Sequence, residues 1–266
     1  MLDNYDSLVD VVIPTYNDSK LVLLAIISAL EQGPVVREIF VVDDGSSPKI
    51  VSELSDFIDK QDNVSLVLSE RYSNPGIIRN IGLRKATAKY VAFLDSDDTW
   101  IKDSLLQRVI ILEKLNKKFV CSNAYKINAN VKTPYFLVTK RSRTSTINLI
   151  RGNAVITSTV VVRRDAFIHQ GGFPEEYAFR GVEDYLAWLR FSLFSELHYL
   201  NEFCAEYMIN ESGLSQSSTR DGSIFALMGF YADLGFKSHV TVKEYLAKVF
   251  YRFLIHRRIY QLGNPK

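Results

Sequence analysis

Two apolar stretches in the first hundred residues each run directly into a group of carboxylates. Tyr90–Leu94 ends in Asp95-Ser96-Asp97-Asp98, and Ile39–Val42 ends in Asp43-Asp44-Gly45-Ser46. Open parallel sheets bind their ligands at the carboxyl ends of buried strands, which is where these acids would lie. Adjacent carboxylates repel one another and are costly to desolvate, so a cation or hydrogen-bond donors should compensate them. We therefore expect a ligand site at these strand ends.

Two chemical roles are open for these acids. Asp43 and Asp98 can each cap the turn or helix that follows, a common role of Asp. Capping explains one acid per strand end, but it does not explain five acids over two strands. A divalent cation carrying a phosphorylated ligand would compensate the others, and Mg²⁺ or Mn²⁺ prefers such oxygen ligands. We therefore favour a metal-assisted ligand site.

Strands alternate with helices through this first part of the chain. Apolar runs predict strands at Val9–Ile13, Glu38–Val42, Val64–Leu68 and Lys89–Leu94. Helices are expected between them, over about 19–32, 48–60 and 77–87. Such alternation is typical of an α/β fold with a mostly parallel, doubly wound central sheet flanked by helices.

The pattern is less regular after Asp98. We expect helices over about 103–117, 163–170 and 183–194, and strands within 119–123, 155–162 and 197–208. A loop or hairpin is predicted at 128–145, and the Ser- and Gly-rich segment 211–221 is a candidate lid. We divide the chain into two halves of one domain, 1–99 and 100–230, followed by a C-terminal helical segment over 231–266.

Bulk properties exclude several classes of protein. The chain has 266 residues and a formal net charge of +2, which gives no reason to expect nucleic acid as a partner. Cys121 and Cys204 form neither a disulfide framework nor a metal-ligand spacing, so we expect reduced cytosolic thiols. The first residues are polar and acidic, unlike a signal peptide, and no apolar run approaches the roughly 20 residues that cross a bilayer. A soluble, cytoplasmic protein is predicted.

The C-terminal segment leaves peripheral membrane contact open. Apolar residues recur at helical spacing from Val242 to Phe253, and residues 241–266 hold six Lys or Arg against one Glu. A basic amphipathic helix of this kind can lie on the anionic inner face of a membrane. A terminal helix packed on the core with a solvated basic face has the same pattern, so both interpretations stay open.

Five segments together resemble the family 2 glycosyltransferases, which are inverting enzymes of the GT-A fold with an Asp-x-Asp motif. These segments are Val11–Asn17, Val41–Ser47, Asn74–Gly82, Phe93–Asp98 and Gly181–Arg190. Each is weak alone, but their order and spacing over about 180 residues are specific. The resemblance implies a GT-A-type fold, a nucleotide-sugar donor and a divalent metal.

The resemblance also implies which residues bind the nucleotide. Pro14, Thr15 and Tyr16 would line the base, and Asp44 would accept a hydrogen bond from its imide N–H. Such a bond favours uracil or thymine, because the wrong base would leave a buried carboxylate unpaired. Arg79 would point toward the nucleotide pocket, with a surface ion pair as the alternative.

The implied metal site lies at the Asp-x-Asp unit. Asp95 would lie against the ribose or donor sugar, Ser96 occupies the middle position, and Asp97 would coordinate Mn²⁺ or Mg²⁺. The metal would act as a Lewis acid on the diphosphate leaving group, which needs positive charge as the glycosidic bond breaks.

On the acceptor side the resemblance makes Asp184 the general base that removes the acceptor hydroxyl proton. Glu183 precedes it in the same first helical turn, where acids are favoured by the helix dipole in any case. Trp188 could stack on a sugar or belong to the core. Thr157-Ser158-Thr159 lies where relatives build the floor of the acceptor site.

These features predict transfer of one sugar from a nucleotide-sugar, most simply a UDP-sugar, to a hydroxyl of a lipid-linked or surface-polysaccharide glycan. The chain lacks the Gln-x-x-Arg-Trp segment and membrane helices of processive synthases, which favours single-sugar transfer. A sugar nucleotidyltransferase would show a Gly-rich loop after the first strand, and the loop here contains no glycine. A non-catalytic protein that binds a nucleotide-sugar or glycan remains a third possibility.

Overall fold

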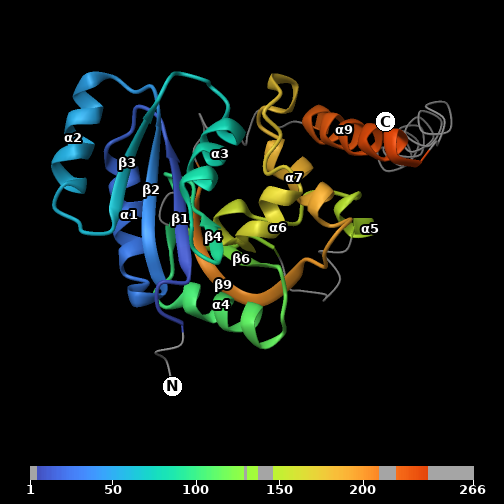
Figure 1. Ribbon diagram of the computed structural model, residues 1–266, viewed down its shortest axis with the longest axis horizontal. Helices are drawn as coiled ribbons and strands as arrows, with labels where there is room; N and C mark the ends of the chain where they lie inside the picture. Colours follow the sequence, from blue (N-terminus) through green and yellow to red (C-terminus); the bar gives the residue numbers. More distant parts are fainter. Residues whose placement is uncertain (1–4, 129–130, 137–145, 210–219, 239–266) are drawn as a thin grey trace, which may run out of the picture.

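The computed structural model describes residues 5–128, 131–136, 146–209 and 220–238 (Figure 1). The strands of the first half are β1 (Val9–Thr15), β2 (Val36–Asp44), β3 (Val64–Ser69) and β4 (Tyr90–Phe93). The helices of this half are α1 (Lys20–Leu30), η2 (a 3₁₀ turn, Gly33–Val35), α2 (Pro48–Ile58) and α3 (Pro75–Lys85). The predicted alternation is confirmed here, with small shifts at the element ends.

The second half has shorter and more varied elements. Its strands are β5 (Thr99–Trp100), β6 (Phe119–Asn128), β7 (Val131–Pro134), β8 (Val161–Arg163) and β9 (His198–Met208). Its helices are α4 (Ser104–Lys114), α5 (Thr146–Leu149), η3 (Thr157–Thr159), α6 (Arg164–His169), η4 (Tyr177–Phe179), α7 (Glu183–Phe191) and α9 (Arg220–Ser238). Strands β6 and β7 pair antiparallel, so the hairpin predicted after residue 128 is confirmed where the structure describes it.

One sheet runs through both halves in the order β3-β2-β1-β4-β8-β6-β9-β5, and β7 pairs with β6 outside this path. Strands β1 to β4 are parallel to one another, as predicted. Beyond β4 the sheet is mixed: β8 is antiparallel to both of its neighbours, whereas β6 and β9 are parallel. The parallel part therefore brings the carboxyl ends of β1, β2 and β4 to one edge.

The strand predicted over 155–162 is mostly wrong. Only β8 forms, and the residues before it make the 3₁₀ turn η3. The Thr159 hydroxyl donates to the Ile156 carbonyl at 2.8 Å, and the Val160 N–H donates to the Thr157 carbonyl at 3.0 Å. Hydroxyl side chains compete in this way with the ladder bonds of a strand, which explains the turn despite the β-branched sequence.

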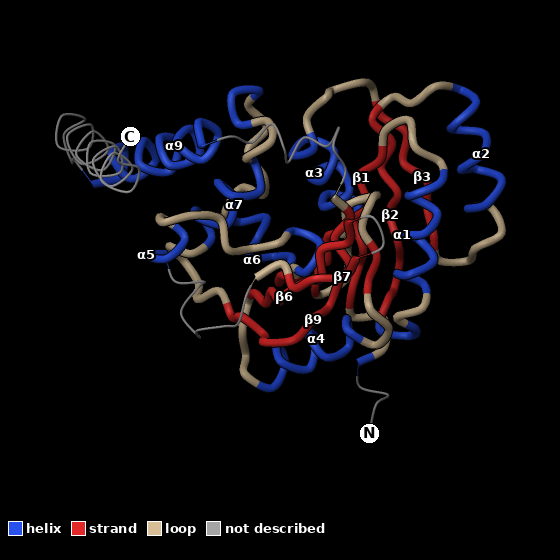
Figure 2. The backbone as a smooth tube through the Cα atoms, turned by 180° about the vertical axis from the view of Figure 1, so that it is seen from behind, coloured by secondary structure: helices blue, strands red, loops and turns tan. Residues whose placement is uncertain are grey.

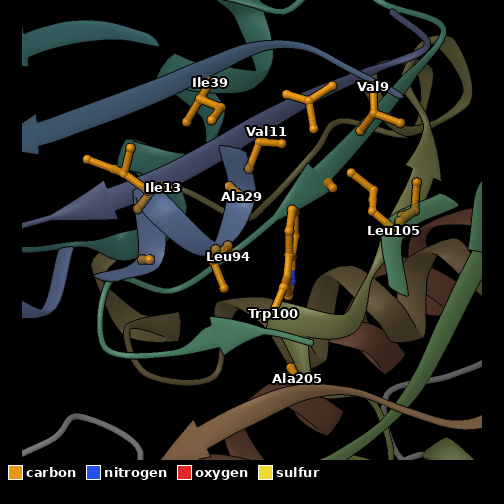
Figure 3. Close-up of a cluster of buried hydrophobic side chains, with 14 of the residues drawn as sticks. Val9, Val11, Ile13, Ala29, Ile39, Leu94, Trp100, Leu105 and Ala205 are labelled. Carbon is orange, nitrogen blue, oxygen red and sulfur yellow. The ribbon is translucent and has the colours of Figure 1, made fainter. Parts of the chain in front are cut away.

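The sheet is apolar on both faces because successive strand residues point to opposite sides. Val11 and Ile13 pack with α1, α2 and α4 in one core cluster, whereas Val12 packs with α3, α6 and α7 in the other. Figure 3 shows part of the first cluster, where Trp100 and Leu105 meet the β1 side chains. Figure 2 shows the strands as the middle layer, with α1 and α2 on one side and α3 on the other.

The chain ends its described part in α9, which begins at residue 220, earlier than the helical segment predicted from 231. Buried Ala226 and Phe230 of α9 belong to the same core cluster as α7. The basic residues of the tail and most of the candidate lid lie outside the described residues. No helix within the described ranges is long and apolar enough to cross a membrane.

Candidate active site

A cavity of about 500 Å³ opens at the carboxyl ends of the parallel strands. All of the predicted site residues except Ser158 and Trp188 line it. Those that line it are Pro14, Thr15, Tyr16, Asp44, Arg79, Asp95, Ser96, Asp97, Thr157, Glu183 and Asp184. Residues from both halves of the chain therefore face one another across a single cavity.

At one end of the cavity, Asp44 holds an arginine that sequence reasoning did not assign. The Arg71 guanidinium pairs with the Asp44 carboxylate and lies over the Tyr16 ring, 3.3 Å from its centroid. The backbone N–H groups of Tyr72 and Ser73 also donate to Asp44, at 2.6 and 3.0 Å. Arg71 lies just after the end of β3. The rule that ligands bind at the carboxyl ends of parallel strands, which pointed to Asp44, would therefore have indicated Arg71 as well.

Two neighbouring acids have structural roles. The Asp43 carboxylate accepts from the Ser46 N–H at 2.8 Å and so supports the turn after β2, as capping predicts. Gly45 in that turn has φ +69°, a conformation that side chains disfavour. Asp18 lines the cavity but accepts from the N–H groups at the start of α1, at Lys20 and Leu21.

Of the acids after β4, Asp95 and Asp97 are half-buried and Asp98 is buried. Asp98 is buried and accepts from the Ser158 hydroxyl at 2.5 Å and the Met208 N–H at 3.1 Å. Burial, with a smaller effect of the carboxylates of Asp97 and Asp95, raises the pKa of Asp98 well above its usual value. Ser158 also accepts from the Asp95 N–H, so it supports this strand end from below and does not line the cavity.

Asp97 lines the cavity and, unlike Asp95, forms no ion pair within the described residues. Burial and the nearby Asp95 raise its pKa to about 6. Among the described residues, no group of three or more His, Cys, Asp or Glu side chains is gathered as a metal site. Mg²⁺ is commonly held by one or two carboxylates with substrate phosphates and waters, so Asp97 beside Asp95 fits a metal shared with a phosphorylated ligand.

Arg79 connects the two sides of the cavity. Its guanidinium donates to Asp95 at 2.6 Å and to Glu183 at 2.8 Å, and it is 7% exposed. Burial opposes its charge, but the two carboxylates outweigh this and raise the pKa of Arg79. Asn74 begins its helix by accepting from the Gly76 N–H at 3.0 Å. Arg79 thus lines the cavity while bound to acids from both halves.

Glu183 and Asp184 point to different partners. Glu183 is buried and accepts from Arg79 and from the Gly181 N–H at 2.6 Å. Asp184 accepts from the Thr157 hydroxyl at 3.0 Å and from the Tyr185 N–H at 2.6 Å. Burial and the adjacent Glu183 raise the pKa of Asp184 to about 6, against the opposing effect of Arg79. A carboxylate of this kind is ionised at neutral pH and basic enough to accept a proton.

Trp188 does not reach the cavity. It is fully buried and packs against the rings of Phe119, Phe167 and Phe173, with centroids 5.3, 5.6 and 5.4 Å away. The core alternative for this residue is therefore the one that the structure supports. Tyr135 and Tyr207 line the cavity instead, in edge-to-face contact at 5.2 Å, and no sequence pattern indicated them.

The chain belongs to glycosyl transferase family 2, since the model of that family matches residues 10–169. The match covers the strand-end acids and ends before Asp184. The predicted family is thus confirmed.

Two curated relatives are similar over most of their length. The *Escherichia coli* protein UDP-Glc:alpha-D-GlcNAc-diphosphoundecaprenol beta-1,3-glucosyltransferase WfgD is 28% identical over 81% of this chain and 83% of its own. The putative teichuronic acid biosynthesis glycosyltransferase TuaG of *Bacillus subtilis* is 28% identical, over 81% and 84%.

The fold is also found among solved structures. *S. aureus* TarS, residues 1–349 in complex with UDP-GlcNAc, superimposes with a TM-score of 0.65 at 20% identity. The match covers 79% of this chain and 61% of that TarS chain. The GT-A-type α/β fold predicted from the sequence is confirmed.

Proposed function

We propose that this protein transfers one sugar from a UDP-sugar to a hydroxyl group of a glycan or lipid-linked acceptor, with inversion. The observation that carries the proposal is the single cavity in which Asp97 of the strand end and Asp184 of α7 are both lining residues. Family membership supports glycosyl transfer. WfgD, which is named for UDP-Glc and a sugar linked to diphosphoundecaprenol, supports the substrate classes.

On the donor side, Tyr16, Asp44 and Arg71 would hold the nucleotide base. They form one connected group, in which the cation lies between an aromatic face and a carboxylate. Asp97 would hold Mn²⁺ or Mg²⁺, which when bound supplies positive charge to the leaving diphosphate. Asp95 would contact the ribose or donor sugar, with Arg79 fixing its carboxylate.

On the acceptor side, Asp184 would act as the general base. It takes the proton of the acceptor hydroxyl as the acceptor oxygen bonds to the anomeric carbon and the bond from that carbon to the diphosphate oxygen breaks. The Thr157 hydroxyl orients the carboxylate, and the paired charges of Glu183 and Arg79 hold the start of α7. A single displacement of this kind inverts the anomeric configuration.

We also propose that the protein is cytoplasmic and that its basic C-terminal segment contacts the membrane. The residues that would make that contact, 239–266, lie outside the described residues. Vesicle binding by the full chain, compared with a chain ending at residue 240, would test the contact directly.

Calorimetric titration of UDP, dTDP, GDP and CDP, each with and without Mn²⁺, tests the donor site. The wild type should bind UDP most tightly and only with metal, and Asp97→Asn should lose this binding. Asp103→Asn is a matched control, because it neutralises a nearby exposed acid that does not line the cavity. Absence of nucleotide binding under all conditions would contradict the proposed function.

A further inference from the structure

Three arginines line the cavity, and two of them are engaged by carboxylates. Arg71 pairs with Asp44, and Arg79 pairs with Asp95 and Glu183. Arg180 differs from both. Among the described residues no carboxylate forms an ion pair with it, its Nη1 donates only weakly to the Tyr177 hydroxyl at 3.4 Å, and its Nε–H is buried without an acceptor.

The charge of Arg180 stands out because the cavity is otherwise acidic. Its other charged lining residues are Asp18, Asp44, Arg71, Arg79, Asp95, Asp97, Glu183 and Asp184, and no lysine is among the described lining residues. A phosphorylated ligand entering this cavity would meet mostly negative charge. The planar guanidinium of an arginine matches the geometry of phosphate oxygens and binds them strongly. Arg180 therefore has the charge, geometry and free hydrogen-bond donors that such a ligand requires.

Arg180 lies four residues before the proposed base, Asp184, and both residues line the cavity. It directly precedes Gly181, whose φ of +82° turns the chain so that its N–H donates to Glu183 at the start of α7. Arg180, Gly181, Glu183 and Asp184 all line the cavity. An anion bound by Arg180 would thus lie in the same cavity as Asp184, at the segment that leads into α7.

We propose that Arg180 binds a diphosphate group of a substrate. This inference rests on the proposed function. Two sources share this chemistry: the diphosphate of the nucleotide donor, and a diphosphate that links the acceptor sugar to a lipid. The place of Arg180 on the segment that leads into the helix of Asp184 favours the acceptor, and the acceptor named for WfgD carries such a diphosphate. Arg180 would then select acceptors that present a diphosphate close to the accepting hydroxyl.

Calorimetry separates the two sources. UDP is titrated into the wild type and Arg180→Ala, and farnesyl diphosphate is titrated into the same proteins saturated with UDP, at a fixed excess of Mg²⁺. Removal of a charge-assisted contact should weaken diphosphate binding by about 10-fold to 100-fold. Weaker farnesyl diphosphate binding with unchanged UDP affinity assigns the acceptor diphosphate, and weaker UDP binding with unchanged uridine affinity assigns the donor diphosphate.

Two controls keep the result specific. Arg84→Ala removes an equal charge from an exposed arginine of α3 that does not line the cavity, and it should leave both affinities unchanged. Arg180→Lys keeps the charge and should lose less affinity than Arg180→Ala. Equal affinities in the wild type and Arg180→Ala, or no binding of either diphosphate by the wild type, would overturn the proposal. Farnesyl diphosphate binding that depends on Arg180 without any nucleotide binding would instead contradict the proposed function alone.

Discussion

The two sides of the cavity position their acids in different ways. On the proposed donor side, Asp44 ends β2, and Asp95 and Asp97 follow the end of β4, so the parallel strands bring them together. On the proposed acceptor side, Asp184 lies in the first turn of α7, and its hydroxyl partner Thr157 comes from a 3₁₀ turn 27 residues earlier. The positions of the acids on the proposed donor side therefore follow from local sequence within the alternating strands and helices. The position of Asp184 depends instead on contacts between distant segments.

Arg79 makes the two sides depend on each other. It lies on α3, yet one of its carboxylate partners, Glu183, lies 104 residues later, on α7. Its charge also opposes the rise in the pKa of Asp184. The comparison thus predicts that some substitutions affect one side alone, while a change at Arg79 affects both.

The largest effect on activity is expected from Asp184→Asn. The amide keeps the shape of the side chain but removes the proposed base, so kcat should fall about 10³-fold. Affinity for UDP should stay unchanged, since the donor side is positioned separately. Asp56→Asn, an exposed acid on α2, is the control and should retain full activity. Turnover close to the wild-type rate in Asp184→Asn would remove Asp184 as the base.

Arg79→Ala should affect both sides of the cavity. Two carboxylates, 5% exposed in Glu183 and 28% in Asp95, would lose their cation. Breaking a buried pair of this kind typically costs about 3–5 kcal/mol of unfolding free energy, which denaturant titration measures. We also expect kcat/KM to fall about 100-fold, because both Asp95 and the start of α7 lose a fixed partner.

A pH profile separates this electrostatic role from a purely structural one. Without the Arg79 charge the pKa of Asp184 should rise further, and the acid limb of kcat/KM should move to higher pH with it. Arg79→Lys keeps the charge and should retain the wild-type limb. An unchanged limb in a folded Arg79→Ala protein would mean that Arg79 supports the fold without tuning the base.

The next smaller effect is the fall of kcat/KM at low pH in the wild type. The base must be ionised, so kcat/KM should fall below the pKa of about 6 and lie about tenfold under its plateau at pH 5. The sign for stability is opposite. Because the folded pKa lies above the usual 3.8, the unfolding free energy contributed by Asp184 should decrease as pH rises from 3.8 to about 6. Denaturant titrations at the two ends of this pH range should show that decrease in the wild type and not in Asp184→Asn.

The sequence predicts the donor half of the fold well because its signals are local. Apolar runs of strand length, Pro75 at a helix start and acids after strands each act within a few residues of where they occur. The failure at 155–162 has the opposite cause, since hydroxyl groups in η3 bond to nearby backbone atoms and to Ser122 and Asp98. Ser122 lies on β6 and Asp98 in the turn between β4 and β5, and a local pattern includes neither.

The same distinction holds for the site. The rule that ligands bind at the carboxyl ends of parallel strands selects Asp44 and Asp97, and applied to β3 it would also have selected Arg71. Tyr135, Arg180 and Tyr207 line the cavity only because separate loops and strands converge there, and nothing in their immediate sequence distinguishes them. The acceptor side is therefore where structure adds most to what the sequence predicts.

The smallest effect on activity is expected from Trp188→Phe. Its ring lies wholly within the aromatic core and its Nε1–H has no acceptor among the described residues, so the change removes packing but no hydrogen bond. We expect a loss of about 1–3 kcal/mol in unfolding free energy and an unchanged KM for the acceptor. Tyr207→Ala removes a ring that lines the cavity and should raise that KM several-fold. A raised acceptor KM in Trp188→Phe at unchanged stability would show instead that Trp188 contacts the acceptor. Trp188 would then belong to the acceptor-binding surface and not to the core alone.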